Sequence, residues 1–295
     1  MPPKARSIPG PECKACLEGL AARAMDGAGL RGGVRVQVQQ GINKDIAQGL
    51  ADGKAPALIA TRFLAEIRGA SGVDDPFASH KAADMQAAGA AARALKGWER
   101  SWARACRAAI VGNALDFFEI GQPKRLIAQA RALGLGVDHL KEAERLLYPG
   151  GRVVILADNC GEQAFDRILV AHLEARGMSV SYAVKSGPVQ NDLTITDLKR
   201  FGEDWGLGEI VPTGTEQVGL DPRRVPPALE GLLERAAVVI AKGMGHYETL
   251  RRGSGLWPGG RVRWNILFLL MAKCSPVARS LGVAKGSGVA LLERA

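Results

Sequence analysis

The sequence contains few aromatic residues, and its basic residues form no run interleaved with them. Phe, Trp and Tyr make up 5% of the 295 residues, while Lys and Arg are spread over most of the expected helices. This pattern argues against nucleic-acid binding. The formal net charge of +9 then favours small anionic partners, although solvated helix faces explain most of it.

The sequence also lacks a long apolar segment. Its N-terminus, which reads MPPKARSIP, has no stretch of the kind that a secretory signal needs. The apolar run at residues 266–271 is too short to cross a bilayer. Five cysteines, an odd number at irregular spacing, fit a reducing compartment better than a disulfide framework. We therefore expect a cytoplasmic protein with no membrane partner; no feature indicates its oligomeric state.

Familiar nucleotide and protease motifs are missing as well. The sequence has no G-x-x-x-x-G-K-[ST], no G-x-G-x-x-G after its first strong strand, and no H-E-x-x-H. These absences argue against a P-loop NTPase, a simple dinucleotide enzyme and a zincin protease.

The first half has the periodicity of helices. Apolar spacing predicts helices at residues 12–30, 57–67, 79–95, 98–118 and 123–133. Residues 34–39 alternate as a strand would, but their surroundings are helical, so we predict a helix there too.

Periodicity changes after Pro149-Gly150-Gly151, the clearest break in the chain. Strands are predicted at residues 152–157, 179–184, 209–211, 237–241 and 262–271, the last of the chain, and helices at 162–176, 196–205 and 226–235. Such alternation is typical of a parallel, doubly wound sheet. We expect a mostly helical region at residues 1–148 and an α/β metal- and phosphate-binding domain at 149–295.

Polar residues follow three of the predicted strands. Asp158 and Asn159 follow the first, Lys185 and then Asn191-Asp192 the second, and Lys242-Gly243-x-Gly245-His246 a later one. The ends of parallel strands share one edge of a sheet. Two carboxylates and an amide there can hold a hard divalent cation. The lysines and the N–H groups of the Gly-rich turns can receive phosphate oxygens.

Each of these segments also has a purely structural interpretation. Asp158-Asn159 and Asn191-Asp192 could be helix caps or turns. Two functional alternatives also stay open. An S-adenosylmethionine-dependent methyltransferase has a similar sheet, although it normally has a Gly-rich turn where this chain has Asp158-Asn159. A non-catalytic protein could bind a phosphometabolite and metal without turnover.

The chain resembles the damage-control phosphatases, formerly domain of unknown function 89, and in particular their stand-alone prokaryotic type. The resemblance spans nearly the whole chain, with several specific motifs in the right order. The matching segments are Cys13-x-x-Cys16, Asp75-Pro76 followed by Lys81, Val111-Gly112-Asn113-x-x-Asp116-Phe117, Asp158-Asn159-x-Gly161-Glu162, Lys185-x-Gly187-Pro188-x-x-Asn191-Asp192-x-Thr194, Ala241-Lys242-Gly243-x-Gly245-x-x-Glu248-Thr249-Leu250, Lys273-Cys274-x-Pro276-Val277-Ala278 and Gly286-Ser287.

The resemblance implies a metal-dependent phosphatase acting on sugar phosphates or related metabolites, with a helical region packed on a three-layer α/β/α sandwich. It implies Asp158, Asn159 and Asp192 as ligands of Mn²⁺, Co²⁺, Ni²⁺ or Mg²⁺. Catalytic roles would fall to Asp158, Asp192, Asp116 and Lys242, with Asp116 or Asp192 as a conceivable nucleophile. Substrate or phosphate contacts would come from Asn113, Lys81, Lys185, Gly187, Asn191, Gly243, Gly245 and His246.

Cysteine and histidine residues account for the remaining features. Cys160 stands where the family usually has a small residue, and His246 where it often has Asn. We interpret Cys160 as a buried inert thiol; His246 could be an acid or base, or a turn residue bonded to the backbone. Cys13-x-x-Cys16 has metal-ligand spacing but no second pair, which leaves a second metal site, a redox site or two free thiols open.

Overall fold

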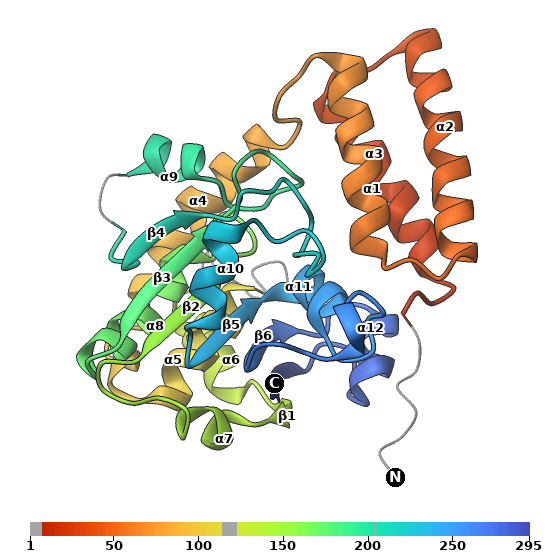
Figure 1. Ribbon diagram of the computed structural model, residues 1–295. Coiled ribbons are helices and arrows are strands. Elements are labelled where there is room, and N and C mark those ends of the chain that lie inside the picture. The colour runs from red at the N-terminus through yellow and green to blue at the C-terminus, as the bar shows by residue number, and fades with distance from the viewer. Residues whose placement is uncertain (1–7, 114–122, 203–204) are drawn as a thin grey trace.

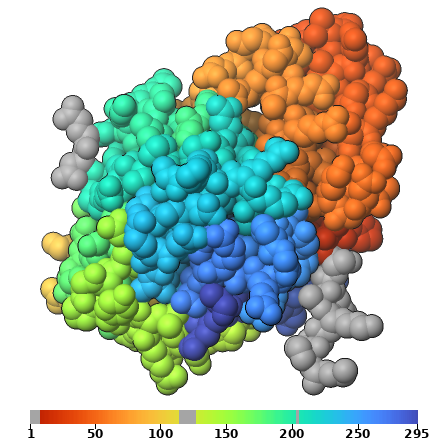
Figure 2. Space-filling model, in the orientation of Figure 1, coloured from red at the N-terminus to blue at the C-terminus, as the bar shows by residue number. Residues whose placement is uncertain are grey.

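The structure is a computed structural model that describes residues 8–113, 123–202 and 205–295. Three N-terminal helices stand beside an α/β sandwich (Figures 1 and 2). The expected α/β class, with its helical N-terminal region, is confirmed. No helix within the described ranges is long and apolar enough to cross a membrane.

The N-terminal helices are α1 (Cys13–Gly27), α2 (Gly32–Ala51) and α3 (Pro56–Ser71), and they share a core of their own. The ambiguous residues 34–39 belong to α2, as predicted. Val34 and Val36 are 52% and 56% exposed, so the alternating apolar pattern does not correspond to the buried face of a strand. Val38, Ile42 and Ile46 are buried instead, four residues apart on one side of the helix.

The described residues form one seven-stranded sheet in the order β1-β7-β6-β5-β2-β3-β4. Strands β2 to β6 are parallel, while β7 pairs antiparallel with β6 and parallel with β1. The strands are β1 (Leu135–Asp138), β2 (Arg152–Leu156), β3 (Ser179–Val184), β4 (Glu209–Pro212), β5 (Val238–Lys242), β6 (Ile266–Met271) and β7 (Gly288–Glu293).

Two sequence predictions about the sheet were wrong. β6 begins at Ile266 rather than at residue 262, and it is not the last strand, because β7 follows it. β1 was not predicted at all. Both missed strands lie on one side of the sheet and pair with each other, so they depend on a contact between residues far apart in the chain.

Helices cover both faces of the sheet and complete the three layers (Figure 1). One core cluster joins the sheet to α4 (Ala78–Arg93), α5 (Trp102–Gly112) and α8 (Gln163–Ala175). The other joins it to α10 (Pro227–Glu234), α11 (Gly243–Leu250) and α12 (Ser275–Leu281). The shorter helices are η1 (Trp98–Arg100), α6 (Pro123–Ala132), α7 (Leu140–Glu144), α9 (Ile195–Phe201) and η3 (Pro258–Gly260).

Several elements that precede residue 148 contribute to the sandwich, α4 among them. Helix α5 packs against α8, and β1 pairs with β7. The division into domains at residue 148 stays a prediction. The predicted helix at 98–118 is a single 3₁₀ turn followed by α5, and its residues 114–118 lie outside the described ranges.

The strand order reverses at β2, which has β3 on one side and β5 on the other. The chain proceeds from β2 to β3 in one direction and from β5 to β6 in the other. Open α/β sheets bind ligands at the carboxyl ends of the strands flanking such a reversal. The segments after β2, β3 and β5 carry Asp158, Asp192 and Gly243, so the topology brings three predicted site segments together.

Candidate active site

A cavity of about 400 Å³ lies between the N-terminal helices and the carboxyl edge of the sheet. Its floor comes from the segments after β2, β3 and β5, and its wall from α1 and α3. The lining residues are Cys16, Leu17, Leu20, Arg23, Pro56, Ala57, Ala60, Asp84, Gly112, Asn113, Asp158, Asn159, Cys160, Glu162, Gln190, Asn191, Asp192, Val218, Met244, Gly245, Glu248 and Lys273.

Asp158 lies at the centre of the floor. The amide groups of Asn113 and Asn159 each donate a hydrogen bond of 2.9 Å to its Oδ2 atom. Burial raises the pKa of Asp158 well above its usual range, and the charges of Glu162 and Asp192 raise it further. A carboxylate held ionised here therefore requires compensating positive charge.

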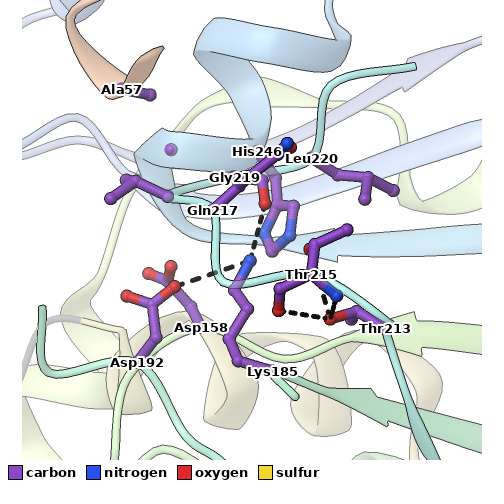
Figure 3. A network of polar contacts seen from close by, with 12 residues as sticks. Ala57, Asp158, Lys185, Asp192, Thr213, Thr215, Gln217, Gly219, Leu220 and His246 are labelled. Atoms are coloured by element: carbon purple, nitrogen blue, oxygen red, sulfur yellow. Dashed lines mark hydrogen bonds and ion pairs between the residues drawn. The ribbon is translucent and has the colours of Figure 1, made fainter. Parts of the chain in front are cut away.

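Asp192 reaches the same floor from the segment after β3. It is 1% exposed, and its backbone forms an antiparallel bridge with Asn159. Its Oδ2 atom forms an ion pair with Lys185 Nζ at 3.5 Å (Figure 3), and it accepts no hydrogen bond from the described residues. Burial raises the pKa of Asp192 to about 6, against the opposing effect of Lys185. Asp192 thus presents a buried carboxylate oxygen whose charge is balanced in part by Lys185.

The backbone around Asp192 is strained. Gln190 has a φ of 50°, the one positive value at a non-glycine residue in the described chain. Residues held in this region cost free energy and persist where the surrounding structure enforces them, often at functional sites. Both Gln190 and Asn191 line the cavity.

The structure contradicts the helix-cap interpretation of these polar segments, but it bears out the turn interpretation: the Asp192 N–H donates to the Val189 carbonyl oxygen at 3.1 Å, and the Glu162 N–H to that of Asn159 at 3.2 Å. Helix α8 has Glu162 at its N-cap, so neither Asp158 nor Asn159 caps it. Thr194 caps α9 through a capping box with Asp197. Asp158, Asn159, Asn191 and Asp192 therefore lie at the cavity without a role as helix caps.

Glu162 connects the floor to a buried lysine. Its Oε1 atom accepts hydrogen bonds of 2.8 Å from the amides of Asn113 and Asn159. Its Oε2 atom accepts one of 2.7 Å from Lys242 Nζ, which also donates to Asp166 Oδ1 at 2.7 Å. Burial opposes the charge on Lys242, but Asp166 and Glu162 raise its pKa. The lysine therefore stays charged and holds the carboxylates in place.

The other two predicted phosphate lysines are also buried. Lys81 Nζ lies 3.0 Å from Asp75 and 3.1 Å from Asp197. Lys185 Nζ donates to the Gly219 carbonyl oxygen at 2.6 Å (Figure 3), and burial lowers its pKa. None of the three lysines is among the described residues that line the cavity.

The predicted glycine and histidine positions differ in their surroundings. Gly243 and Gly245 lie in the first turn of α11 rather than in a free turn, and Gly245 lines the cavity. A Cβ atom at Gly243 would overlap the Asp158 carboxylate, and one at Gly187 would overlap Glu216. His246 Nδ1 lies 2.7 Å from the Lys242 carbonyl oxygen, and burial lowers its pKa, so the ring is neutral.

The cysteines are all free thiols. Cys160 is buried, as expected, and burial raises its pKa. Cys13 is buried, and Cys16 is exposed and lines the cavity. No group of three or more His, Cys, Asp or Glu side chains within the described ranges has the arrangement of a metal site. The predicted residue Asp116 lies outside the described residues.

Five charged residues of the cavity were not predicted as site residues: Arg23, Asp84, Glu162, Glu248 and Lys273. Glu248 Oε2 accepts a hydrogen bond of 3.0 Å from the Ala57 backbone N–H, and burial raises its pKa to about 7. Glu162, Glu248 and Lys273 stand in the segments that carry the family resemblance, which was the available signal. Arg23 on α1 and Asp84 on α4 stand outside those segments and had none.

The topology and the cavity together define an α/β protein with an acidic, oxygen-rich site at a strand-order reversal. Comparison with known proteins gives the family. The damage-control phosphatase ARMT1-like domain matches residues 13–289. A damage-control phosphatase of Pyrococcus horikoshii is 31% identical over 95% of this chain and 96% of its own length. One of Archaeoglobus fulgidus is 31% identical over 84% of this chain and 86% of its own.

A solved structure supports the same conclusion. The crystal structure of a protein of the family of domain of unknown function 89 from Pyrococcus horikoshii superposes with a TM-score of 0.80 at 30% identity, covering 96% of this chain and 98% of that one. The chain belongs to the family of the damage-control phosphatase ARMT1-like domain, which confirms the resemblance seen in its motifs. Phosphatases are hydrolases, and the family places the chain among them.

Proposed function

We propose that this chain is a metal-dependent phosphatase that hydrolyses small phosphorylated metabolites. The observation that carries the proposal is the convergence of Asp158, Asn159 and Asp192 on the floor of one cavity, from segments that follow β2 and β3. Sugar phosphates or related phosphomonoesters are the proposed substrates, and damage control, as in the names of the relatives, is the proposed role.

These three residues fit a hard divalent cation. Asp192 Oδ2 is buried, accepts no hydrogen bond from the described residues and has Lys185 Nζ at 3.5 Å, and burial disfavours the charge on both carboxylates. The Asn159 amide NH₂ is directed at Asp158 and Glu162, so its carbonyl oxygen is the atom that remains for a cation. Two carboxylates and one amide oxygen suit Mn²⁺, Co²⁺, Ni²⁺ and Mg²⁺ alike. When bound, such an ion polarises a phosphoryl group and lowers the pKa of water.

The surrounding residues would position these groups. Asn113 bridges Asp158 and Glu162, and its own Oδ1 accepts the Met271 N–H at 3.2 Å, so the amide orientation is set by the backbone. Lys242 holds Glu162 and acts as a positioning residue rather than as a phosphate ligand. Among the described residues, the cations that line the cavity and would meet substrate oxygens are Arg23 and Lys273.

The segment after β2 argues against the methyltransferase alternative, and the binding-protein alternative has to be separated by experiment. A methyltransferase needs a Gly-rich turn after its first strand, and here Asp158 and Asn159 occupy the segment after β2. A non-catalytic binding protein would bind metal and phosphate with the same residues but would release no phosphate. Turnover therefore separates the two.

The test is hydrolysis of para-nitrophenyl phosphate by protein freed of metal and then given Mn²⁺, Co²⁺, Ni²⁺ or Mg²⁺. We expect metal-dependent release of nitrophenol, and a fall in kcat/KM of about 10³-fold in Asp158→Ala and Asp192→Ala. Metal binding by calorimetry should weaken in the same variants. Asp221→Asn is the matched control, because Asp221 is also a buried carboxylate but pairs with Arg223 away from the cavity.

Metal-dependent turnover that persists in both alanine variants would refute the assignment. Tight metal binding with no turnover on a broad panel of phosphorylated metabolites would instead favour the non-catalytic alternative.

A further inference from the structure

Three of the five cysteines gather where α1 meets α12. Cys13 is the first residue of α1, Cys16 lies one turn further along it, and Cys274 is the N-cap residue of α12. The two helices are joined at this point, because Arg279 donates hydrogen bonds of 2.7 and 2.8 Å to the Glu12 carboxylate. Burial raises the pKa of Cys274 to about 11, and the nearby Glu248, Cys13 and Cys16 also raise it.

The three thiols differ in their access to solvent. Cys16 is exposed and lines the cavity. Cys13 is 7% exposed, and its Sγ atom accepts a hydrogen bond of 3.4 Å from the Gly10 N–H. Burial raises the pKa of Cys13, so it is a thiol at neutral pH. A small oxidant arriving through the cavity therefore meets Cys16 first.

Helix geometry allows Cys13 and Cys16 to bond. Residues three apart in an α-helix share a face. With a rise of 1.5 Å per residue and a radius of about 2.3 Å, their Cα atoms lie about 5 Å apart. Disulfides span Cα distances of roughly 4.4–6.8 Å. The pair can close without movement of α1 relative to α12.

We propose that Cys16 and Cys13 form a thiol pair that keeps the cavity free of thiol adducts, with Cys16 as the attacking and Cys13 as the resolving residue. The co-reactant is a small disulfide of the glutathione type. The Cys16 thiolate attacks one sulfur of that disulfide, its S–S bond breaks, and one small thiol leaves with a proton.

Cys13 completes the reaction. Its sulfur attacks Cys16 Sγ in the mixed disulfide, and its proton passes to the second small thiol as that leaves. Two protein thiols are thereby oxidised and one small disulfide is reduced to two thiols. Without Cys13, the adduct would stay on Cys16 and occupy part of the cavity of about 400 Å³. The compact Cys13–Cys16 disulfide would not.

The test exposes the reduced full chain to glutathione disulfide and measures intact mass and mapped peptides. In the unaltered chain we expect a Cys13–Cys16 disulfide, seen as the loss of two hydrogens, with no retained adduct. Cys13→Ser should instead retain one glutathionyl group on Cys16, and Cys16→Ser should take none in this cluster. Cys274→Ser is the matched control and should behave like the unaltered chain. The buried thiols Cys106 and Cys160 should stay unmodified throughout.

A second measurement uses the activity and rests on the proposed function. After treatment with glutathione disulfide, the metal-dependent hydrolysis rate of Cys13→Ser should fall by about tenfold or more. Dithiothreitol should restore the rate, as expected for a reversible block of the site. Reduced Cys13→Ser should match the unaltered chain, which would show that the variant folds.

The mass measurement tests the cysteine pairing, and the activity measurement also depends on the proposed function. A stable adduct on Cys16 in the unaltered chain, or a Cys16–Cys274 disulfide, would overturn the pairing whatever the enzymatic activity. Correct disulfide formation in a protein without phosphatase activity would leave the pairing intact and refute only the proposed function.

Discussion

The floor and the wall of the cavity are built in opposite ways. The floor consists of charged and amide side chains from the sheet edge, several of them buried and linked by hydrogen bonds, as in the chain from Asp158 through Asn113 and Glu162 to Lys242. The wall combines buried apolar side chains such as Leu17, Leu20 and Ala60, which belong to the core of the three N-terminal helices, with the exposed residues Cys16 and Arg23.

This difference suggests separate roles, with the floor carrying out the chemistry and the wall selecting the substrate. Buried charges are costly unless every partner is present, so the floor tolerates little change. The wall is a helix surface, where exposed residues can change with little effect on stability. We therefore expect substitutions in the floor to affect stability and turnover together, and those at exposed wall positions to affect substrate choice alone.

Lys242→Met should have the largest effect on the floor. It would leave Glu162 and Asp166 buried without their shared cation, which typically costs about 3–5 kcal/mol of unfolding free energy. Urea unfolding measures the loss. The control is Lys14→Met at an exposed pair on α1, which should change stability by less than about 0.5 kcal/mol. Equal losses in both variants would contradict a structural role for the buried lysine.

Gly243→Ala should have the next largest effect on stability. The added Cβ would overlap the Asp158 carboxylate, and φ at Gly243 is 77°. We expect a loss of about 2–4 kcal/mol from strain and overpacking, together with a lower kcat. Gly282→Ala has a similar φ of 69° but open space around its Cβ, so it should cost only about 1–2 kcal/mol and keep full activity. Indistinguishable activities would show that Asp158 adjusts freely.

Glu248→Gln examines the junction between floor and wall, where α11 meets the first turn of α3. Burial raises the pKa of Glu248 from 4.5 to about 7, so between these values the folded chain binds more protons than the unfolded chain. Its contribution to stability therefore falls as pH rises from about 5 to 8, by about 2 kcal/mol. The variant should lose this dependence and be the more stable of the two at pH 8. Parallel pH profiles of unfolding free energy would contradict the assignment.

Arg23→Ala should have the smallest effect, and it tests a wall residue without changing the floor. Arg23 is exposed on α1, so stability should stay within about 0.5 kcal/mol. KM should rise several-fold for substrates with a second anionic group, and kcat should not change, because the interaction is made equally in the ground and transition states. Steady-state kinetics on a panel of phosphorylated metabolites measures this. A fall in kcat with KM unchanged would place Arg23 with the catalytic residues instead.

Local sequence patterns were sufficient for the central strands. Residues 153–157 are a continuous apolar run and residues 180–184 are apolar except for Ser181; both stretches are bounded by turn residues and became buried parallel strands. β1 escaped prediction because it has four residues, one of them glycine, and pairs only with a strand from the far end of the chain. β7 follows a glycine-rich turn and pairs antiparallel, a direction that no local signal specified.

For the site, the chain alone determined where oxygen-bearing side chains follow the strands, because turns and strand ends are local features. Only the tertiary structure decided which charges face the cavity. Lys242 meets Glu162 and Asp166, which are 80 and 76 positions away, so its ammonium points into the protein. Arg23 reaches the cavity because α1 packs beside the sheet edge. The burial that determines the partners and the pKa of Lys242 arises only when distant segments assemble.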